Sequence, residues 1–359
     1  MILLEEVSPN GNVTAVVEED GRSAYFYLNF HDAEPGPGRV KACWVRNLAT
    51  APAELDVDAM RDGNPPMLPA PPCRHPEGLP PPSPGDLTVV WFEEGDAAAL
   101  LEGAEILAVL PSWAGLGNFP GYARDCIAEN PLCWPLPVGP SLAERIRLAR
   151  EYWGLWDDDS FWEEYRDALL APIEAALGRP HAQYFAIDQG QWPPKAILRF
   201  DLDDRSLLIT LGVSVRPQPG VELVAEDPIA LRRIELAAAF DPECPSDEVL
   251  AFGRYLSAQS GYPWVQGTWL GEGHSLPCDS VPPALGGPAF GAVLLTAHPA
   301  GAPRIDLPAV WGDPILLLWM IPITPEEREL AVRDGSDALL GRLIAAGVGG
   351  VHRLRESVV

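Results

Sequence analysis

The sequence has few basic residues, and lysine is almost absent. Its 359 residues contain 25 Lys or Arg against 51 Asp or Glu, which gives a formal net charge of −26 at pH 7. The only lysines are Lys41 and Lys195, so few amines are available for Schiff-base chemistry. Because nucleic-acid binding relies on basic side chains that neutralise phosphates, we expect no nucleic-acid partner.

Long apolar runs are missing as well. The longest strongly apolar run, residues 315–323, is far shorter than the roughly 20 residues that cross a bilayer. The chain starts with three apolar residues followed by two carboxylates, and it lacks the basic segment of a secretory signal. We therefore expect a cytoplasmic protein with no membrane partner.

Motifs for metal, phosphate or nucleophilic chemistry are absent too. The sequence contains no GxxxxGK, HExxH or GxSxG motif, and its six histidines are isolated from one another. The six cysteines are too widely scattered for a zinc knuckle or a thioredoxin-like motif. They are Cys43, Cys73, Cys126, Cys133, Cys244 and Cys278. We expect reduced thiols without disulfides, no metal, no cofactor and no catalytic residue.

The patterns that are present indicate an α+β protein with two α+β domains. Residues 1–140 read mainly as strands, including a hairpin over residues 13–28, with a short helix expected over residues 96–101. A proline-rich stretch at residues 64–85 cannot form a helix or a central strand, so we expect a mobile surface loop there. The turn-forming residues before position 141 mark a change of periodicity, and we place the second domain at residues 141–359.

The second domain is expected to hold a mixed sheet flanked by helices. Capping-box patterns that begin at Ser141 and Ser160 predict two helices. Residues 315–321 are apolar on both faces, which predicts a central strand covered on both sides. Thr324 and Glu327 then form a third capping box, with a proline at the first helical position.

Two small groups of residues offer an enzymatic interpretation. Cys126 would be a nucleophile if His31 or His75 lay beside it, although a cysteine next to apolar residues is commonly a buried small side chain. Glu272 and His274 would share one face of an extended segment and form an acid–base pair. Neither group has an evident third member that would orient it.

Aromatic and acidic residues in two loops and one helix-linking segment favour protein binding. The residues concerned are Trp113, Phe119 and Tyr122, then Trp269, Glu272 and His274, and finally Asp157, Asp158 and Asp159. Aromatic side chains give large contact area at small entropic cost. We predict that both loops border one cleft, with the carboxylates as an acidic rim for a basic ligand. The alternative is that Trp113 and Trp269 fill the core beneath their loops.

Four segments resemble one known family. Residues 208–214 read LITLGVS, residues 233–236 read RIEL, residues 267–274 read GTWLGEGH, and residues 313–330 begin with DPILLLW. This ordered set is similar to the bacterial branch of the suppressor-of-fused domain, and the resemblance covers about residues 160–350.

The resemblance implies an α+β domain that holds protein partners and has no assigned catalytic residue. Bacterial members resemble immunity proteins, each of which blocks one toxin. Our leading hypothesis is therefore a non-enzymatic immunity protein, whose charge of −26 would attract a basic toxin domain. The alternatives are a regulator that captures an extended peptide by strand addition, and a hydrolase or transferase that uses Cys126 or the pair Glu272 and His274. No oligomeric state is predicted.

Overall fold

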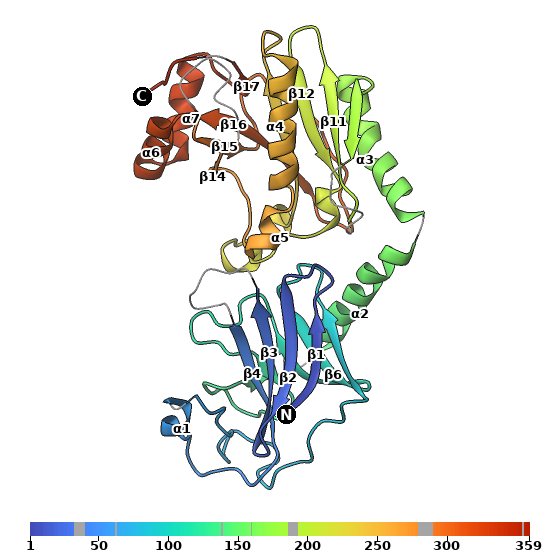
Figure 1. Ribbon diagram of the computed structural model, residues 1–359, viewed down its shortest axis with the longest axis vertical. Helices are drawn as coiled ribbons and strands as arrows, with labels where there is room; N and C mark the ends of the chain where they lie inside the picture. Colours follow the sequence, from blue (N-terminus) through green and yellow to red (C-terminus); the bar gives the residue numbers. More distant parts are fainter. Residues whose placement is uncertain are drawn as a thin grey trace. The chain divides into compact units, whose positions relative to one another are not determined.

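The computed structural model of the protein describes all residues except 32–39, 62, 138, 159, 186–192, 279–289 and 354. The chain divides into two compact units (Figure 1). The N-terminal unit comprises residues 1–156 with 264–267, and the C-terminal unit comprises residues 157–263 with 268–359. Both helices and strands are present in antiparallel and mixed sheets, so the predicted α+β class is confirmed.

The first sheet of the N-terminal unit is a four-stranded antiparallel meander. Its strands follow the order of the chain: β1 (Ile2–Val7), β2 (Val13–Glu19), β3 (Ser23–Phe30) and β4 (Val40–Asn47). The predicted hairpin is confirmed, because β2 pairs with β3 around a turn in which Gly21 has a φ of 81°. The Asp20 carboxylate accepts hydrogen bonds from two backbone N–H groups of this turn, which fixes its conformation.

The second sheet of the N-terminal unit has five strands. They are β5 (Leu87–Trp91), β6 (Ala98–Glu102), β7 (Glu105–Leu110), β8 (Tyr122–Ala123) and β9 (Trp134–Pro135). The helix predicted over residues 96–101 was wrong, since this stretch forms β6. The run of alanines and leucines is buried between β5 and β7 and hydrogen-bonds to both. Pairing with two neighbouring strands therefore outweighs the helix propensity of the segment.

The two N-terminal sheets share one hydrophobic core, to which Phe26 and Trp44 contribute from the first sheet and Leu100 and Leu107 from the second. Two helices belong to this unit, α1 (Val57–Arg61) and α2 (Pro140–Gly154). Helix α2 buries Ile146 in a cluster with residues of β5 and β6. The division between the units therefore lies after Trp156, past the turn-forming residues before position 141.

The proline-rich stretch at residues 64–85 contains no helix or named strand, as predicted. It does not lie wholly at the surface, however, because Leu68 and Cys73 are buried in the N-terminal core. The side chain of Asn47 donates to the Leu68 carbonyl and accepts from the Leu68 N–H. Trp44 donates a third hydrogen bond to the same amide oxygen. The core thus holds the stretch at Leu68.

The C-terminal unit is built on one mixed eight-stranded sheet. Its strands are β10 (Ala182–Phe185), β11 (Ala196–Asp201), β12 (Ser206–Leu211), β13 (Arg233–Phe240), β14 (Ser275–Pro277), β15 (Ala292–Thr296), β16 (Ile315–Ile323) and β17 (Val351–His352). The sheet order is β10-β11-β12-β13-β16-β15-β14, with β17 paired to β13. The predicted strand over residues 184–187 extends beyond the described part of β10.

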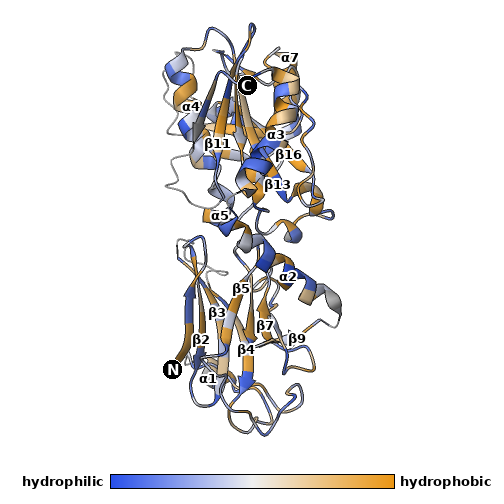
Figure 2. Ribbon diagram, turned by 90° about the vertical axis from the view of Figure 1, so that its right-hand side faces the viewer, coloured by the Kyte–Doolittle hydropathy of each residue, from blue (hydrophilic) through white to orange (hydrophobic). Residues whose placement is uncertain are grey.

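Strand β16 is central, as its apolar sequence predicted. It pairs in parallel with β13 and antiparallel with β15. Its last seven residues are buried, and Figure 2 shows hydrophobic residues along it. A strand without a polar side chain fits only where both faces of the sheet are covered.

Helices flank this sheet. They are α3 (Phe161–Leu177), α4 (Ser246–Gln259), α6 (Pro325–Asp334) and α7 (Ser336–Ala345), whereas the short α5 (Tyr262–Gln266) is divided between the two units. The capping box of α6 is confirmed, with Thr324 and Glu327 bonding each other's backbone N–H. Within the described helices, none is long and apolar enough to cross a membrane.

The other two predicted capping boxes do not form. The N-cap of helix α2 is Gly139, two residues before the expected Ser141, so the helix starts at Pro140 and Ser141 lies inside its first turn. Ser160 is the N-cap of α3, but its hydroxyl donates to the Asp158 carboxylate instead of accepting from the helix. Both helices exist nonetheless, because their stability depends more on the buried face than on a cap.

The buried histidine of β17 gives stability a dependence on pH. His352 packs edge-on against the rings of Phe240 and Phe290, and burial lowers its pKa to about 4. An unfolded histidine binds a proton below about pH 6.5, whereas the folded one does not until the pH approaches 4. The unfolded state therefore holds more protons in this window, and stability is lost as the pH falls through it.

We predict that His352→Phe, which keeps a ring between Phe240 and Phe290, abolishes this dependence. Between about pH 7 and pH 5 the wild-type free energy of unfolding should fall by about 2 kcal/mol more than that of the variant. Urea denaturation at several pH values measures the difference. The exposed His298 supplies the control His298→Gln, which should follow the wild type. Parallel curves for wild type and His352→Phe would show that the buried imidazole is not responsible.

Candidate functional site

The residues predicted to bind a partner belong to different units. Trp113, Phe119 and Tyr122 are in the N-terminal unit, whereas Trp269, Glu272, His274, Asp157 and Asp158 are in the C-terminal unit. Asp159 lies outside the described residues. Each group is therefore considered within its own unit, and the shared cleft stays a prediction.

The aromatic loop at residues 113–122 folds back onto the N-terminal core. Phe119 is only 8% exposed, and its ring centroid lies 4.8 Å from that of Tyr122 and 5.0 Å from that of Trp134. Trp113 is half-buried against the same core. The tip of the loop presents Leu116, which is 50% exposed. Phe119 is therefore a core residue and does not fit the predicted role of an exposed anchor.

Trp113 and Tyr122 do meet at a small pocket. It has a volume of about 180 Å³ and is mainly apolar, with Phe92 and Leu142 among its other lining residues. Arg145 also lines it, with its guanidinium 4.8 Å from the Phe92 ring centroid and paired with the buried Glu94. Trp113 and Tyr122, two of the three predicted aromatic residues of this loop, therefore line a pocket.

A buried lysine fixes the chain just before this loop. Lys41 Nζ donates to the carbonyls of Asp96 (2.7 Å) and Ser112 (2.9 Å), and it lies 3.8 Å from the Asp96 carboxylate. Ser112 Oγ donates to the same carboxylate at 2.8 Å. Burial lowers the pKa of Lys41. With its ammonium surrounded by acceptors, Lys41 is a positioning residue for the neighbouring Trp113.

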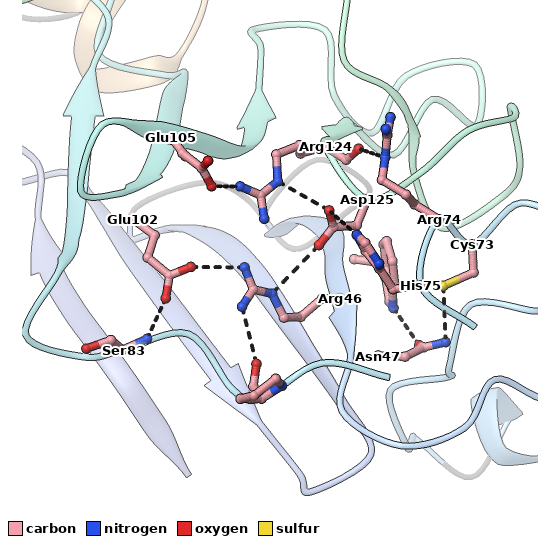
Figure 3. A network of polar contacts seen from close by, with 12 residues as sticks. Arg46, Asn47, Cys73, Arg74, His75, Ser83, Glu102, Glu105, Arg124 and Asp125 are labelled. Atoms are coloured by element: carbon pink, nitrogen blue, oxygen red, sulfur yellow. Dashed lines mark hydrogen bonds and ion pairs between the residues drawn. The ribbon is translucent and has the colours of Figure 1, made fainter. Parts of the chain in front are cut away.

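A second polar network surrounds Asp125, which is almost fully buried (Figure 3). The Asp125 carboxylate lies 3.2 Å from Arg124, 3.8 Å from Arg46 and 3.8 Å from His75. Arg46 also pairs with Glu102 at 3.0 Å. Because His75 comes from the proline-rich stretch, this network ties that stretch to the strands beside it.

The enzymatic interpretation of Cys126 does not agree with this geometry. Cys126 is 1% exposed, and His75 faces Asp125 rather than the thiol. Its Sγ hydrogen-bonds with Asn130 Nδ2 (3.3 Å) and with the carbonyls of Ala128 and Cys133. A hydrogen bond from the Cys133 thiol lowers the pKa of Cys126. None of these partners among the described residues is a general base of the kind that activates a nucleophilic thiol.

Glu272 and His274 do not form an acid–base pair either. Glu272 Oε1 accepts from Thr296 Oγ1 at 3.2 Å and from the Ala297 N–H at 3.3 Å. The His274 ring stands edge-on against Trp269, at a centroid distance of 4.3 Å. Burial lowers the pKa of His274, so its ring is neutral near pH 7. Each of these polar side chains serves a local structural contact.

The segments that carry the family resemblance meet in the interior of the C-terminal unit. Glu235 on β13 is fully buried. Its carboxylate accepts hydrogen bonds from the Gly212 N–H (3.0 Å), the Ser214 N–H (3.0 Å) and Thr210 Oγ1 (2.6 Å). Burial raises the pKa of Glu235. This carboxylate holds the sharp turn after β12 in place.

Arg233, two residues earlier on β13, joins the same turn to a distant segment. Its Nη1 donates to the carbonyls of Ser214 (3.0 Å) and Val215 (2.7 Å), and its Nε donates to Asp313 Oδ2 (3.0 Å). The remaining segment, residues 267–274, is attached by Gln218. The Gln218 side chain donates to the Leu270 carbonyl and accepts from the Leu270 N–H. All four segments therefore belong to one connected interior.

Part of the chain matches a known protein family. Residues 191–355 match the model of the family described as Suppressor of fused protein (SUFU). This part of the chain is a SUFU-like domain. A similar solved structure, described as the Sufu-Fu complex crystal structure, is 14% identical with a TM-score of 0.35, over 54% of this chain and 92% of that chain. The search of curated proteins finds no match.

We predict that Gly212→Ala destabilises the SUFU-like domain by at least about 2 kcal/mol. Gly212 has a φ of 102°, and a Cβ there would overlap the Pro194 carbonyl and touch the Trp162 ring. The substitution adds backbone strain to a steric clash beside Glu235. Chemical denaturation measures the free energy of unfolding.

The matched control is Gly341→Ala, at an exposed position inside α7 with open space around it. This change should stabilise the helix by about 0.5–1 kcal/mol. Equal and small effects of the two substitutions would contradict the role assigned to the Gly212 turn.

Proposed function

We propose that the chain is a protein-binding module that does not act as an enzyme. The observation that carries the proposal is the match of residues 191–355 to the SUFU family. The contacts of Cys126, Glu272 and His274 support it, because each side chain is engaged in a local structural contact. These contacts favour a binding function over a catalytic one.

We propose further that the partner is a basic toxin domain and that the protein acts as its immunity protein. The support is electrostatic. A net charge of −26 produces a field that accelerates the approach of a basic protein and repels acidic ones. Because such attraction is screened by ions, the rate of association should fall as salt is added.

Strand addition is a second way in which a partner would bind. Strands β10 and β14 end the eight-stranded sheet, and among the described residues β14 has a paired neighbour on one side only. An extended peptide can extend such an edge by backbone hydrogen bonding. Pro277 at the end of β14 lacks an N–H donor, which limits pairing on this edge to the residues before it.

The test is coexpression with the toxin domain encoded beside this gene. We predict that the chain restores growth and that the purified proteins form a stable complex, with an association rate that decreases with ionic strength. Trp113→Ala should weaken that complex by at least about 2 kcal/mol if Trp113 is a central contact. Val332→Ala, at a 76% exposed position on α6, is the control and should have no effect.

Failure to protect cells, or the absence of a toxin gene beside this one, would contradict the immunity role. Protection with an unchanged affinity for Trp113→Ala would keep that role and remove Trp113 from the binding surface. Thermal melting of each variant confirms that a loss of affinity does not come from unfolding.

A further inference from the structure

A pocket in the C-terminal unit has one charged lining residue and several aromatic ones. It lies between α3 and residues 308–311, with a volume of about 250 Å³. Helix α3 contributes Phe161 and Tyr165, which are four residues apart and so lie on one face. Trp311, from the segment at residues 308–311, is the third aromatic residue, and Glu164 is the charged residue. Neither Glu164 nor Trp311 was predicted as part of a site.

Trp311 is held at the surface by an unusual turn. It has a φ of 48° and is followed by Gly312 with a φ of 91°. The residues on either side, Val310 and Asp313, exchange two backbone hydrogen bonds of 2.8 and 2.9 Å. A bulky residue is rare in this left-handed region, and such strain persists only where the surroundings enforce it. The turn leaves Trp311 54% exposed.

The aromatic walls of the pocket are fixed by contacts behind them. The Arg233 guanidinium lies 4.7 Å from the Trp311 ring centroid, and the Phe161 ring lies nearly parallel to Trp311 at 6.0 Å. Tyr165 is buried, and its hydroxyl shares a 2.7 Å hydrogen bond with Ser214 Oγ. The walls are therefore ordered before any ligand binds, which reduces the entropy lost on binding.

The charge of the pocket is set by Glu164. Arg233, whose guanidinium contacts the Trp311 ring, forms an ion pair with Asp313 and donates to two carbonyls behind the wall. Asp313 also lies 3.8 Å from Arg232. Glu164 is exposed, and among the described residues no cation forms an ion pair with it. Aromatic faces next to a carboxylate attract a planar cation, because a guanidinium both stacks on rings and donates to carboxylate oxygens.

We propose that this pocket binds an arginine side chain of a basic protein partner. The proposal rests on the protein-binding function above, and it agrees with the net charge of −26. The guanidinium would stack against the aromatic wall formed by Phe161, Tyr165 and Trp311 and donate to the Glu164 carboxylate. The pocket would thus add one specific contact to the general electrostatic attraction between the acidic protein and a basic partner.

The experiment uses small probes and does not require the partner. The full chain is labelled with 5-fluorotryptophan, and the Trp311 resonance in the ¹⁹F NMR spectrum is assigned with Trp311→Phe. The labelled protein is titrated with Nα-acetylarginine methylamide and with the uncharged analogue Nα-acetylcitrulline methylamide, in about 150 mM salt to screen distant charges. We expect a saturable shift of the Trp311 resonance, with about tenfold tighter binding of the arginine probe.

Three substitutions on α3 distinguish binding in the pocket from attraction by the overall charge of the protein. Glu164→Gln should reduce the affinity for the arginine probe about tenfold, to that of the citrulline probe. Glu163→Gln removes the same charge from the neighbouring exposed position, which does not line the pocket, and should leave the affinity unchanged. Ala168→Phe, which fills the pocket from its exposed side, should abolish the shift while the circular dichroism stays that of the wild type.

Equal binding of the two probes would overturn the proposal, as would equal losses for Glu164→Gln and Glu163→Gln. The absence of a shift at Trp311 would overturn it too. These outcomes are independent of the toxin experiment. Arginine binding without protection from a toxin would contradict the immunity role alone, and protection without arginine binding would contradict the pocket alone.

Discussion

The C-terminal unit depends on two opposite charges that are removed from water on one strand. Arg233 and Glu235 are two residues apart on β13, so both side chains lie on the same face of the sheet. Desolvating a charge costs several kcal/mol unless its hydrogen-bonding capacity is filled. Backbone groups of residues 212–215 meet part of this requirement, and the Thr210 hydroxyl and the Asp313 carboxylate also contribute. Satisfying these charges therefore fixes the turn after β12 and the segment before β16 together.

The same requirement shapes the surface around Trp311. Asp313, which neutralises Arg233, closes the turn that holds Trp311 outward, and Arg233 itself lies behind the tryptophan ring. Ser214, bound to the Glu235 carboxylate, also holds the hydroxyl of Tyr165. The walls of the exposed pocket are thus anchored to the buried network. Such anchoring orders the walls before a ligand binds, which would lower the entropy lost on binding at the proposed pocket.

Local sequence was sufficient to predict those elements whose residues are compatible with only one structure. The uninterrupted apolar run of β16 fits only in the middle of a covered sheet, and the Thr324 capping box forms because the helix begins directly after that strand. Local sequence was insufficient where contacts with other parts of the chain determine the secondary structure or the burial of a residue. Residues 96–101 suit either a helix or a strand, and pairing with β5 and β7 selected the strand. Phe119 has the sequence context of an exposed anchor, but Trp134, on β9 of the same unit, packs against it.

The candidate sites were harder to predict than the fold, because the recognisable motifs are internal. Glu235, Arg233 and Gly212 give the chain its family resemblance, and all three act inside the SUFU-like domain. Such residues specify a scaffold and carry no information about what binds to it. The signal for the pocket was weaker, namely a Trp-Gly pair in a turn and aromatic residues four apart on α3. Helix α3 precedes residue 191, where the family match begins, whereas Trp311 falls within the match. The proposed pocket therefore combines residues inside the family match with residues outside it.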